Sequence, residues 1–144
     1  MYSMSLSAYE ILALAGALII IPLVIYLATN KRPAESVTVA ASLAAGFGAF
    51  TAVTIWAEGV LPVIINHTSN LWGVQVWFDL LISVTIALLF ILPRARKVKM
   101  NVPLWALFVA STASIGLLAM VGRLFWLERA AMSQVNAADG LKKT

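Results

Sequence analysis

Residues Tyr9–Ala28 form one long apolar run, with a single charged side chain, Glu10, at its beginning. A helix needs roughly 20 mostly apolar residues to cross the hydrocarbon core of a bilayer. Such a segment folds as a helix because a helix satisfies its own backbone hydrogen bonds without water. Three more stretches meet the same requirement: Val37–Ala57, Trp72–Leu92 and Pro103–Leu127.

These four stretches predict an all-α fold. We expect an integral membrane bundle of four transmembrane helices within residues 1–132, followed by a polar C-terminal tail at 133–144. The composition agrees, because 62% of the 144 residues are hydrophobic and 11% are charged, against about 45–50% and about 25% in soluble domains. One connection stays open: residues 58–71 either extend the second span or lie in the membrane interface.

The cysteine and histidine counts limit the chemistry that the chain can perform. The sequence has no cysteine, which excludes disulfides, thiolate metal sites and a cysteine nucleophile. Its single histidine, His67, cannot by itself form a multi-histidine metal centre. No phosphate-binding loop, dinucleotide fingerprint or nucleophile elbow is present either. We therefore expect no enzyme activity, no metal and no cofactor.

Lysine and arginine are distributed unevenly between the connections. The first connection carries Lys31 and Arg32 and the third carries four basic residues, whereas residues 1–8 and 58–71 carry none. Positive residues concentrate on the cytoplasmic side of membrane proteins. The first and third connections are therefore expected in the cytoplasm and both termini outside, although three basic residues near the C-terminus weaken this bias: Arg129, Lys142 and Lys143.

This distribution also accounts for the net charge of +4, so nucleic acid is not an expected partner. The expected location is a bacterial cytoplasmic (inner) membrane, which the chain crosses several times. Its expected partners are the lipid bilayer and other membrane protein subunits.

The second span carries small residues at every fourth position. Helices in lipid associate where small side chains let their backbones approach each other. We expect this face to pack against protein, most closely against the fourth span. Its members are Ala40, Ala44, Gly48 and Ala52.

A carboxylate, Asp79, lies inside the third span, and Gln75 and Ser83 lie four residues to either side of it. Residues four apart share a helix face, so the three form one polar stripe. An Asp at the centre of a span costs about 2.5–3.5 kcal/mol on insertion scales. With four spans, Arg123 would reach a similar depth, and an intramembrane Asp79–Arg123 pair is the expected arrangement. Proton coupling, contact with another subunit, and burial as the neutral acid are the alternatives.

Three segments carry a resemblance to a known family: "NLWGVQVWFDLLISV", "LLFILPRARKVKM" and "IGLLAMVGRLFWLER". They resemble a family of small, uncharacterised bacterial multi-helix membrane proteins, with an Asp-Leu-Leu helix followed by a basic loop. The resemblance covers roughly the latter two-thirds of the chain, which differs in its additional N-terminal span and its "RLFWLER" end. It implies a helical membrane fold and no particular activity. The matching positions are Asn70, Asp79, Leu80, Leu81, Arg96, Lys97 and Met100.

Two functions from different classes fit these observations. The first is an accessory, structural or assembly subunit of a larger membrane protein complex, favoured by the small size, the small-residue face and the lack of a catalytic constellation. The alternative is a small homo-oligomeric proton-coupled transporter that uses Asp79. An enzyme is the weakest reading, because one histidine and scattered carboxylates do not form a reactive site.

Overall fold

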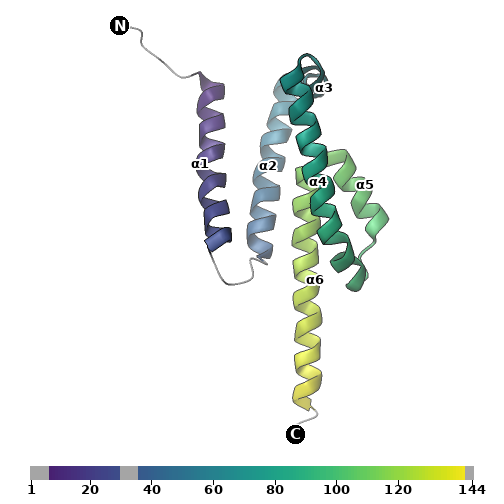
Figure 1. Cartoon of the computed structure of the whole chain (residues 1–144). Helices are drawn as coiled ribbons and strands as arrows, with labels where there is room; N and C mark the ends of the chain where they lie inside the picture. The colour runs from purple at the N-terminus through teal and green to yellow at the C-terminus, as the bar shows by residue number, and fades with distance from the viewer. Residues whose placement is uncertain (1–6, 30–35, 142–144) are drawn as a thin grey trace. The chain divides into compact units, whose positions relative to one another are not determined.

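The structure is a computed structural model that describes residues 7–29 and 36–141, and all of its regular secondary structure in these ranges is α-helical. Figure 1 shows the helices in chain order. The chain divides into two compact units, residues 1–35 and residues 36–144. The helices are α1 (Ala8–Thr29), α2 (Val37–Glu58), α3 (Leu61–Thr68), α4 (Leu71–Lys97), α5 (Val102–Thr112) and α6 (Ser114–Leu141).

The first unit contains α1, and a capping box begins it. The backbone N–H of Ser7 donates to Glu10 Oε2 over 2.7 Å, and the backbone N–H of Glu10 donates to Ser7 Oγ over 3.3 Å. This reciprocal pair satisfies two N–H groups that the first turn of a helix otherwise leaves without partners. The helix then continues through Pro22 without a buried residue in its own unit.

Three helices are long and apolar enough to cross a membrane: α1, α2 and α4. They contain 22, 22 and 27 residues, which corresponds to lengths of roughly 33–40 Å. The expectation of an all-α membrane protein therefore holds, and the three corresponding predicted spans are helices.

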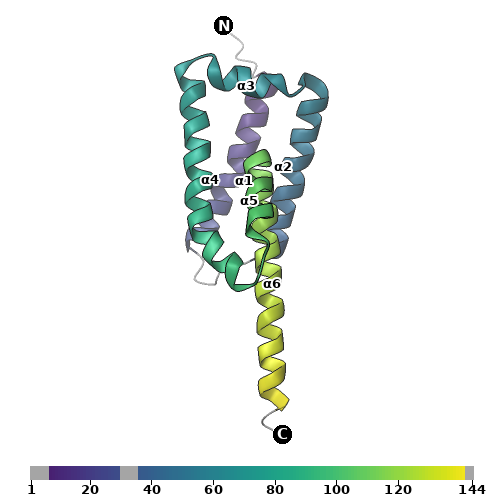
Figure 2. The same cartoon turned by 90° about the vertical axis from the view of Figure 1, so that its right-hand side faces the viewer.

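The predicted fourth span, Pro103–Leu127, is wrong as a single helix. The chain breaks at Ala113, which has a φ of 48°, and separates α5 from α6. In the second unit α5 runs toward the middle of α2 and α4, and α6 returns beside it (Figure 1, Figure 2). The segment therefore forms a hairpin that reaches part of the way along its neighbours. Neither α5 nor α6 is among the helices that are apolar and long enough to cross.

Backbone hydrogen bonds continue on both sides of the break at Ala113. The Ala113 N–H donates to the Val109 carbonyl over 2.7 Å, and the Leu117 N–H donates to the Ala113 carbonyl over 3.0 Å. Thr112 Oγ1 also donates to the Phe108 carbonyl over 2.7 Å. These internal partners reduce the number of backbone groups that the break leaves without a hydrogen bond.

The end of α4 directs the chain into this hairpin. Lys99 has a φ of 57°, its N–H donates to the Arg96 carbonyl, and the Met100 N–H donates to the Ala95 carbonyl. This pair of bonds is a Schellman motif, in which a left-handed residue ends the helix. Asn101 then caps α5, since its side chain accepts from the Leu104 N–H over 3.3 Å.

The hydrophobic core lies where α4, α5 and α6 meet. Side chains from the last turns of α4 pack with the inward faces of both arms of the hairpin, so the core occupies the basic end of the second unit. Its buried members are Ala95, Met100, Val109, Met120 and Leu124.

At the other end, the connection that the sequence left open forms a separate short helix, α3. Gly59 ends α2 with a φ of 82°, and Pro62 lies in the first turn of α3. Asn70 then caps α4 by accepting from the Gly73 N–H over 2.8 Å. A Cβ on Gly73 would collide with the Asn66 carbonyl oxygen, so only glycine allows this close α3–α4 corner.

Residues 133–141 of the expected polar tail continue α6, and residues 142–144 lie outside the described part of the chain. In both views α6 extends beyond the ends of α2 and α4 (Figure 1, Figure 2).

Gly116→Ala should destabilise the hairpin. The added Cβ would lie 2.8 Å from the Phe108 carbonyl oxygen and 2.9 Å from Val109 Cα, and such overpacking costs about 1–3 kcal/mol. We expect a lower thermal unfolding temperature for the detergent-solubilised protein. Gly46→Ala is the matched control, because nothing lies within 4 Å of the added carbon there. Equal unfolding temperatures for the two variants would contradict the close contact between α5 and α6.

Candidate functional site

Asp79 lies on α4 with Gln75 and Ser83, and all three side chains are exposed. Asp79 is eight residues beyond the first residue of α4, which places it about 12 Å from the α3 end of that helix. The face of α4 that packs on the hairpin is a different one, containing Val84, Leu88 and Ile91. The expected polar stripe therefore exists as a continuous face, and it points away from the core of its own unit.

Arg123 lies toward the opposite end of the second unit. It lines the same pocket as Val37, the first residue of α2. Its guanidinium carbon lies 4.3 Å from the ring centroid of Trp126, a cation–π contact. The Arg123 side chain is exposed and forms no ion pair with any residue that the structure describes.

The structure does not bring Asp79 and Arg123 together. Arg94 of α4 and Glu128 of α6 are in contact, and they provide a common reference level. Asp79 lies fifteen residues, about 22 Å, before Arg94 along α4, whereas Arg123 lies five residues, about 7.5 Å, before Glu128. The two side chains are thus offset by roughly 15 Å along the helices. The offset arises because α6 starts part of the way along α4 instead of at its far end.

Within residues 7–29 and 36–141, no lysine or arginine lies at the level of Asp79 along α4. The sequence of α1 contains neither, and the first such residue of α4 is Arg94. His67 lies in α3, at the end of α4 that is closer to Asp79. Its Nδ1 is hydrogen-bonded to the Val63 carbonyl, and its ring lies 5.5 Å from that of Trp77.

An ion pair that the sequence analysis did not identify joins α4 to α6. Arg94 Nε donates to Glu128 Oε1 over 2.9 Å, and Arg94 Nη2 donates to Glu128 Oε2 over 2.6 Å. The guanidinium also lies 5.5 Å from the Phe125 ring centroid. Bidentate arginine–carboxylate pairs are among the stronger side-chain interactions. A single-helix fourth span would have placed Glu128 on the other side of the membrane, so the pair could not be inferred from that topology.

The small residues of α2 lie against α6 over part of their length. Ala40 is buried, and its Cβ is 3.7 Å from the position a Cβ would take on Gly122. A Cβ placed on Gly48 would lie 4.0 Å from Ile115 Cγ2. Ala44 is half-buried and lines the pocket. Ala52 is exposed, because α6 begins at the level of Gly48.

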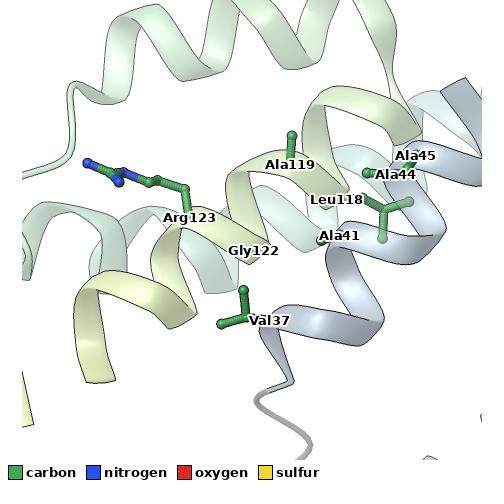
Figure 3. A pocket seen from close by; sticks show the side chains of 8 residues that line it. All are labelled: Val37, Ala41, Ala44, Ala45, Leu118, Ala119, Gly122 and Arg123. Atoms are coloured by element: carbon green, nitrogen blue, oxygen red, sulfur yellow. The ribbon is translucent and has the colours of Figure 1, made fainter. Parts of the chain in front are cut away.

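This pocket, shown in Figure 3, has a volume of about 530 Å³ and lies between α2 and α6. Arg123 occupies one end, and its side chain extends away from Ala44, Ala45 and Leu118 (Figure 3). The remaining lining side chains are small or apolar. The lining residues are Val37, Ala41, Ala44, Ala45, Leu118, Ala119, Gly122 and Arg123.

No group of three or more histidine, cysteine or acidic residues that could hold a metal ion occurs in residues 7–29 and 36–141. Comparison with known proteins finds no matching family model, and neither a curated protein nor a solved structure matches the chain. The physical features of the site therefore carry the functional argument. They are an exposed carboxylate on a membrane helix and a cationic pocket at the opposite end.

The Arg94–Glu128 pair predicts coupled effects on stability. Arg94→Gln and Glu128→Gln should each lower the unfolding temperature, and the double variant should cost less than the sum of the single costs. We expect a coupling free energy of about 1–2 kcal/mol, because the pair is bidentate but partly exposed. Denaturant titration of the four proteins measures it. Arg96→Gln removes the same charge from an exposed side chain of the same helix end and should have little effect. Strictly additive costs would show that the pair does not stabilise the hairpin.

Proposed function

We propose that this protein is a small integral membrane subunit that assembles with a larger membrane protein complex through the Asp79 face of α4. The observation that carries the proposal is the exposure of Asp79 on a helix long enough to cross a membrane. Gln75 and Ser83 extend the same exposed polar face.

A carboxylate that faces lipid within the membrane costs about 2.5–3.5 kcal/mol on insertion scales. Proteins place such groups against protein, water or an opposite charge. Because the described helices hold no lysine or arginine at the depth of Asp79, a partner chain with a cationic or hydrogen-bond-donating side chain is the simplest source. A second copy in the same orientation would carry its Arg123 at the same offset of roughly 15 Å, so a different protein fits better.

The proposal includes a topology of three crossings and one hairpin. In it, α1, α2 and α4 cross the membrane, and the α5–α6 hairpin enters from the cytoplasmic side and returns to it. The N-terminus is then outside and the C-terminus inside. This arrangement puts Arg129, Lys142 and Lys143 on the same side as Lys31, Arg32 and the basic end of α4. All of these positive residues then obey the positive-inside rule, whereas a fourth crossing would place three of them outside. The proposed membrane is the bacterial cytoplasmic (inner) membrane.

A homo-oligomeric proton-coupled transporter is the alternative. Asp79 would supply its titratable group. Against it, the polar face holds only this one acidic group, and the pocket between α2 and α6 lies near the opposite end of the unit. A transport path needs further polar lining at the depth of the coupling group. The assembly role requires only the exposed face.

The topology can be tested with single cysteines, because the chain has none of its own. Ser69→Cys, at the end of α3, should react with a membrane-impermeant thiol reagent in intact spheroplasts. Ser133→Cys, on the exposed part of α6, should react only after permeabilisation. The two substitutions are chemically identical, so each controls for the other. Labelling of Ser133→Cys in intact spheroplasts would support a fourth crossing and overturn the hairpin topology.

The partner face can be tested by photo-crosslinking in cells. A photoreactive phenylalanine analogue at Ser83 should capture another membrane protein, since this position flanks Asp79 on the same face. The same analogue at Leu81, which is also exposed but points away from this face, is the matched control. Adding Asp79→Leu should reduce the Ser83 adduct, because loss of a buried interfacial charge costs about 2 kcal/mol or more, roughly thirtyfold in affinity.

The identity of the crosslinked protein distinguishes the assembly role from the homo-oligomeric alternative. A Ser83 adduct with a different protein that depends on Asp79 supports the assembly role. An adduct with a second copy of the chain supports the homo-oligomeric alternative instead. No adduct, or equal adducts from Ser83 and Leu81, would mean that the Asp79 face is not a protein interface.

A further inference from the structure

We propose that the pocket between α2 and α6 binds an anionic phospholipid, with the headgroup phosphate on Arg123 and an acyl chain along the alanine-lined wall. The inference does not depend on the Asp79 face. It rests on the combination of an apolar groove, a cation at one end of it, and the level of that end relative to the membrane.

The groove itself suits a hydrocarbon chain. Four lining positions of α2 and three of α6 are valine, alanine, leucine or glycine, and Arg123 is the one polar residue of the lining. The small side chains create the space: Gly122 lies against Ala40 at its base, while Ala41 and Ala45 are exposed along its length. A volume of about 530 Å³ is in the range of ordinary ligand pockets.

The charged end lies at the level expected for headgroups. A helix of 22 residues such as α2 has about the length of the hydrocarbon core, so Val37 at its start lies near the interface. Arg123 lines the pocket together with Val37, and its side chain extends away from Ala44, Ala45 and Leu118 (Figure 3). The adjacent Trp126 is about half exposed, as is typical of tryptophan at an interface. An acyl chain in the groove would thus bring its phosphate toward the guanidinium.

Arg123 is available to an anion. The nearest acidic residue on α6, Glu128, uses both of its carboxylate oxygens for Arg94. Within the residues described, Arg123 contacts the Trp126 ring, and its side chain is exposed. Arginine presents a planar set of donors that matches a phosphate. The N-terminus of α2 at the same level adds a favourable partial positive charge.

Native mass spectrometry of the detergent-purified full chain tests this. The protein is titrated with dioleoyl phosphatidylglycerol or with the zwitterionic dioleoyl phosphatidylcholine, and bound lipids are counted. We expect one molecule of phosphatidylglycerol to bind per chain, more tightly than phosphatidylcholine. Arg123→Gln should weaken its binding about fivefold or more, to the level of phosphatidylcholine, since a basic residue near a lipid surface contributes about 1 kcal/mol. Arg96→Gln is the control for charge, because it removes an exposed cation at the same end of the unit.

A second pair of variants tests the groove. Ala45→Leu fills the pocket that Ala45 lines, and it should weaken binding of both lipids. Ala49→Leu makes the same change one turn further along α2 at an exposed position outside the pocket lining, and it should leave binding unchanged. Both sites are exposed, so both variants should fold, which thermal unfolding checks directly.

Three results would overturn the proposal. Equal losses for Arg123→Gln and Arg96→Gln would indicate diffuse attraction to the basic end. Unchanged lipid binding in a folded Ala45→Leu protein would mean that no acyl chain occupies the groove, which would then be a site for a protein segment instead. Displacement of the bound lipid by soluble glycerol phosphate at equal concentration would show that the site recognises a free anion instead of a lipid.

Discussion

The second unit depends on where the chain turns back inside the apolar segment that follows α4. In the proposed re-entrant topology, the backbone at that turn cannot use water, so its donors and acceptors need partners in the protein. At Ala113 both backbone groups have such partners, because its N–H donates to the Val109 carbonyl and its carbonyl accepts from the Leu117 N–H. The turn also needs a close approach between α5 and α6, which Gly116 permits by lacking a side chain. Arg94 and Glu128 then hold the returning helix against α4 at the basic end.

This half-length hairpin has two consequences at opposite ends of the unit. Where α6 is present, α2 and α4 have a protein neighbour, and the buried core and the alanine-lined pocket lie there. α6 begins at the level of Gly48 and Ile115, so it does not cover the parts of α2 and α4 nearer α3, and these parts expose large apolar side chains. Trp56 and Trp72 are 87% and 76% exposed within the chain. Asp79 lies in this second region, so the position of the hairpin explains why no cationic partner for it occurs among the described residues.

The sequence predicted the membrane helices well because long apolar runs are a strong signal. The expected spans 9–28 and 37–57 differ from α1 and α2 by one residue at an end or none. The third was too short, because α4 continues through Pro93 to Lys97. Pro93 lies inside the helix, just before its last turn, where it removes one backbone hydrogen bond. The basic residues after it suit the negative end of the helix dipole. The third helix therefore does not end before Pro93, as the sequence analysis expected.

The break at Ala113 could not be predicted from composition. Alanine favours helices, the residues on both sides are apolar, and the total length equals that of a crossing helix. The available signals were indirect: Gly116 three residues later, and a carboxylate, Glu128, next to a segment otherwise rich in basic residues. Every error about the site followed from this one break, since the depth of Arg123 depends on the direction in which α6 runs.

The two ends of the unit make different demands on their surroundings, and this separates the two proposals physically. At the basic end, Arg123 lies at the expected headgroup level. There the phosphate of a freely diffusing anionic lipid can pair with its guanidinium, so no specific protein is needed. At the other end, Asp79 lies about 12 Å from the start of α4, below the level that headgroups reach. A lipid molecule offers only hydrocarbon at that depth, so a lipid cannot replace a protein partner for the carboxylate. In these two proposals, the bilayer supplies a partner for Arg123 but not for Asp79, and the carboxylate is therefore assigned to a second protein.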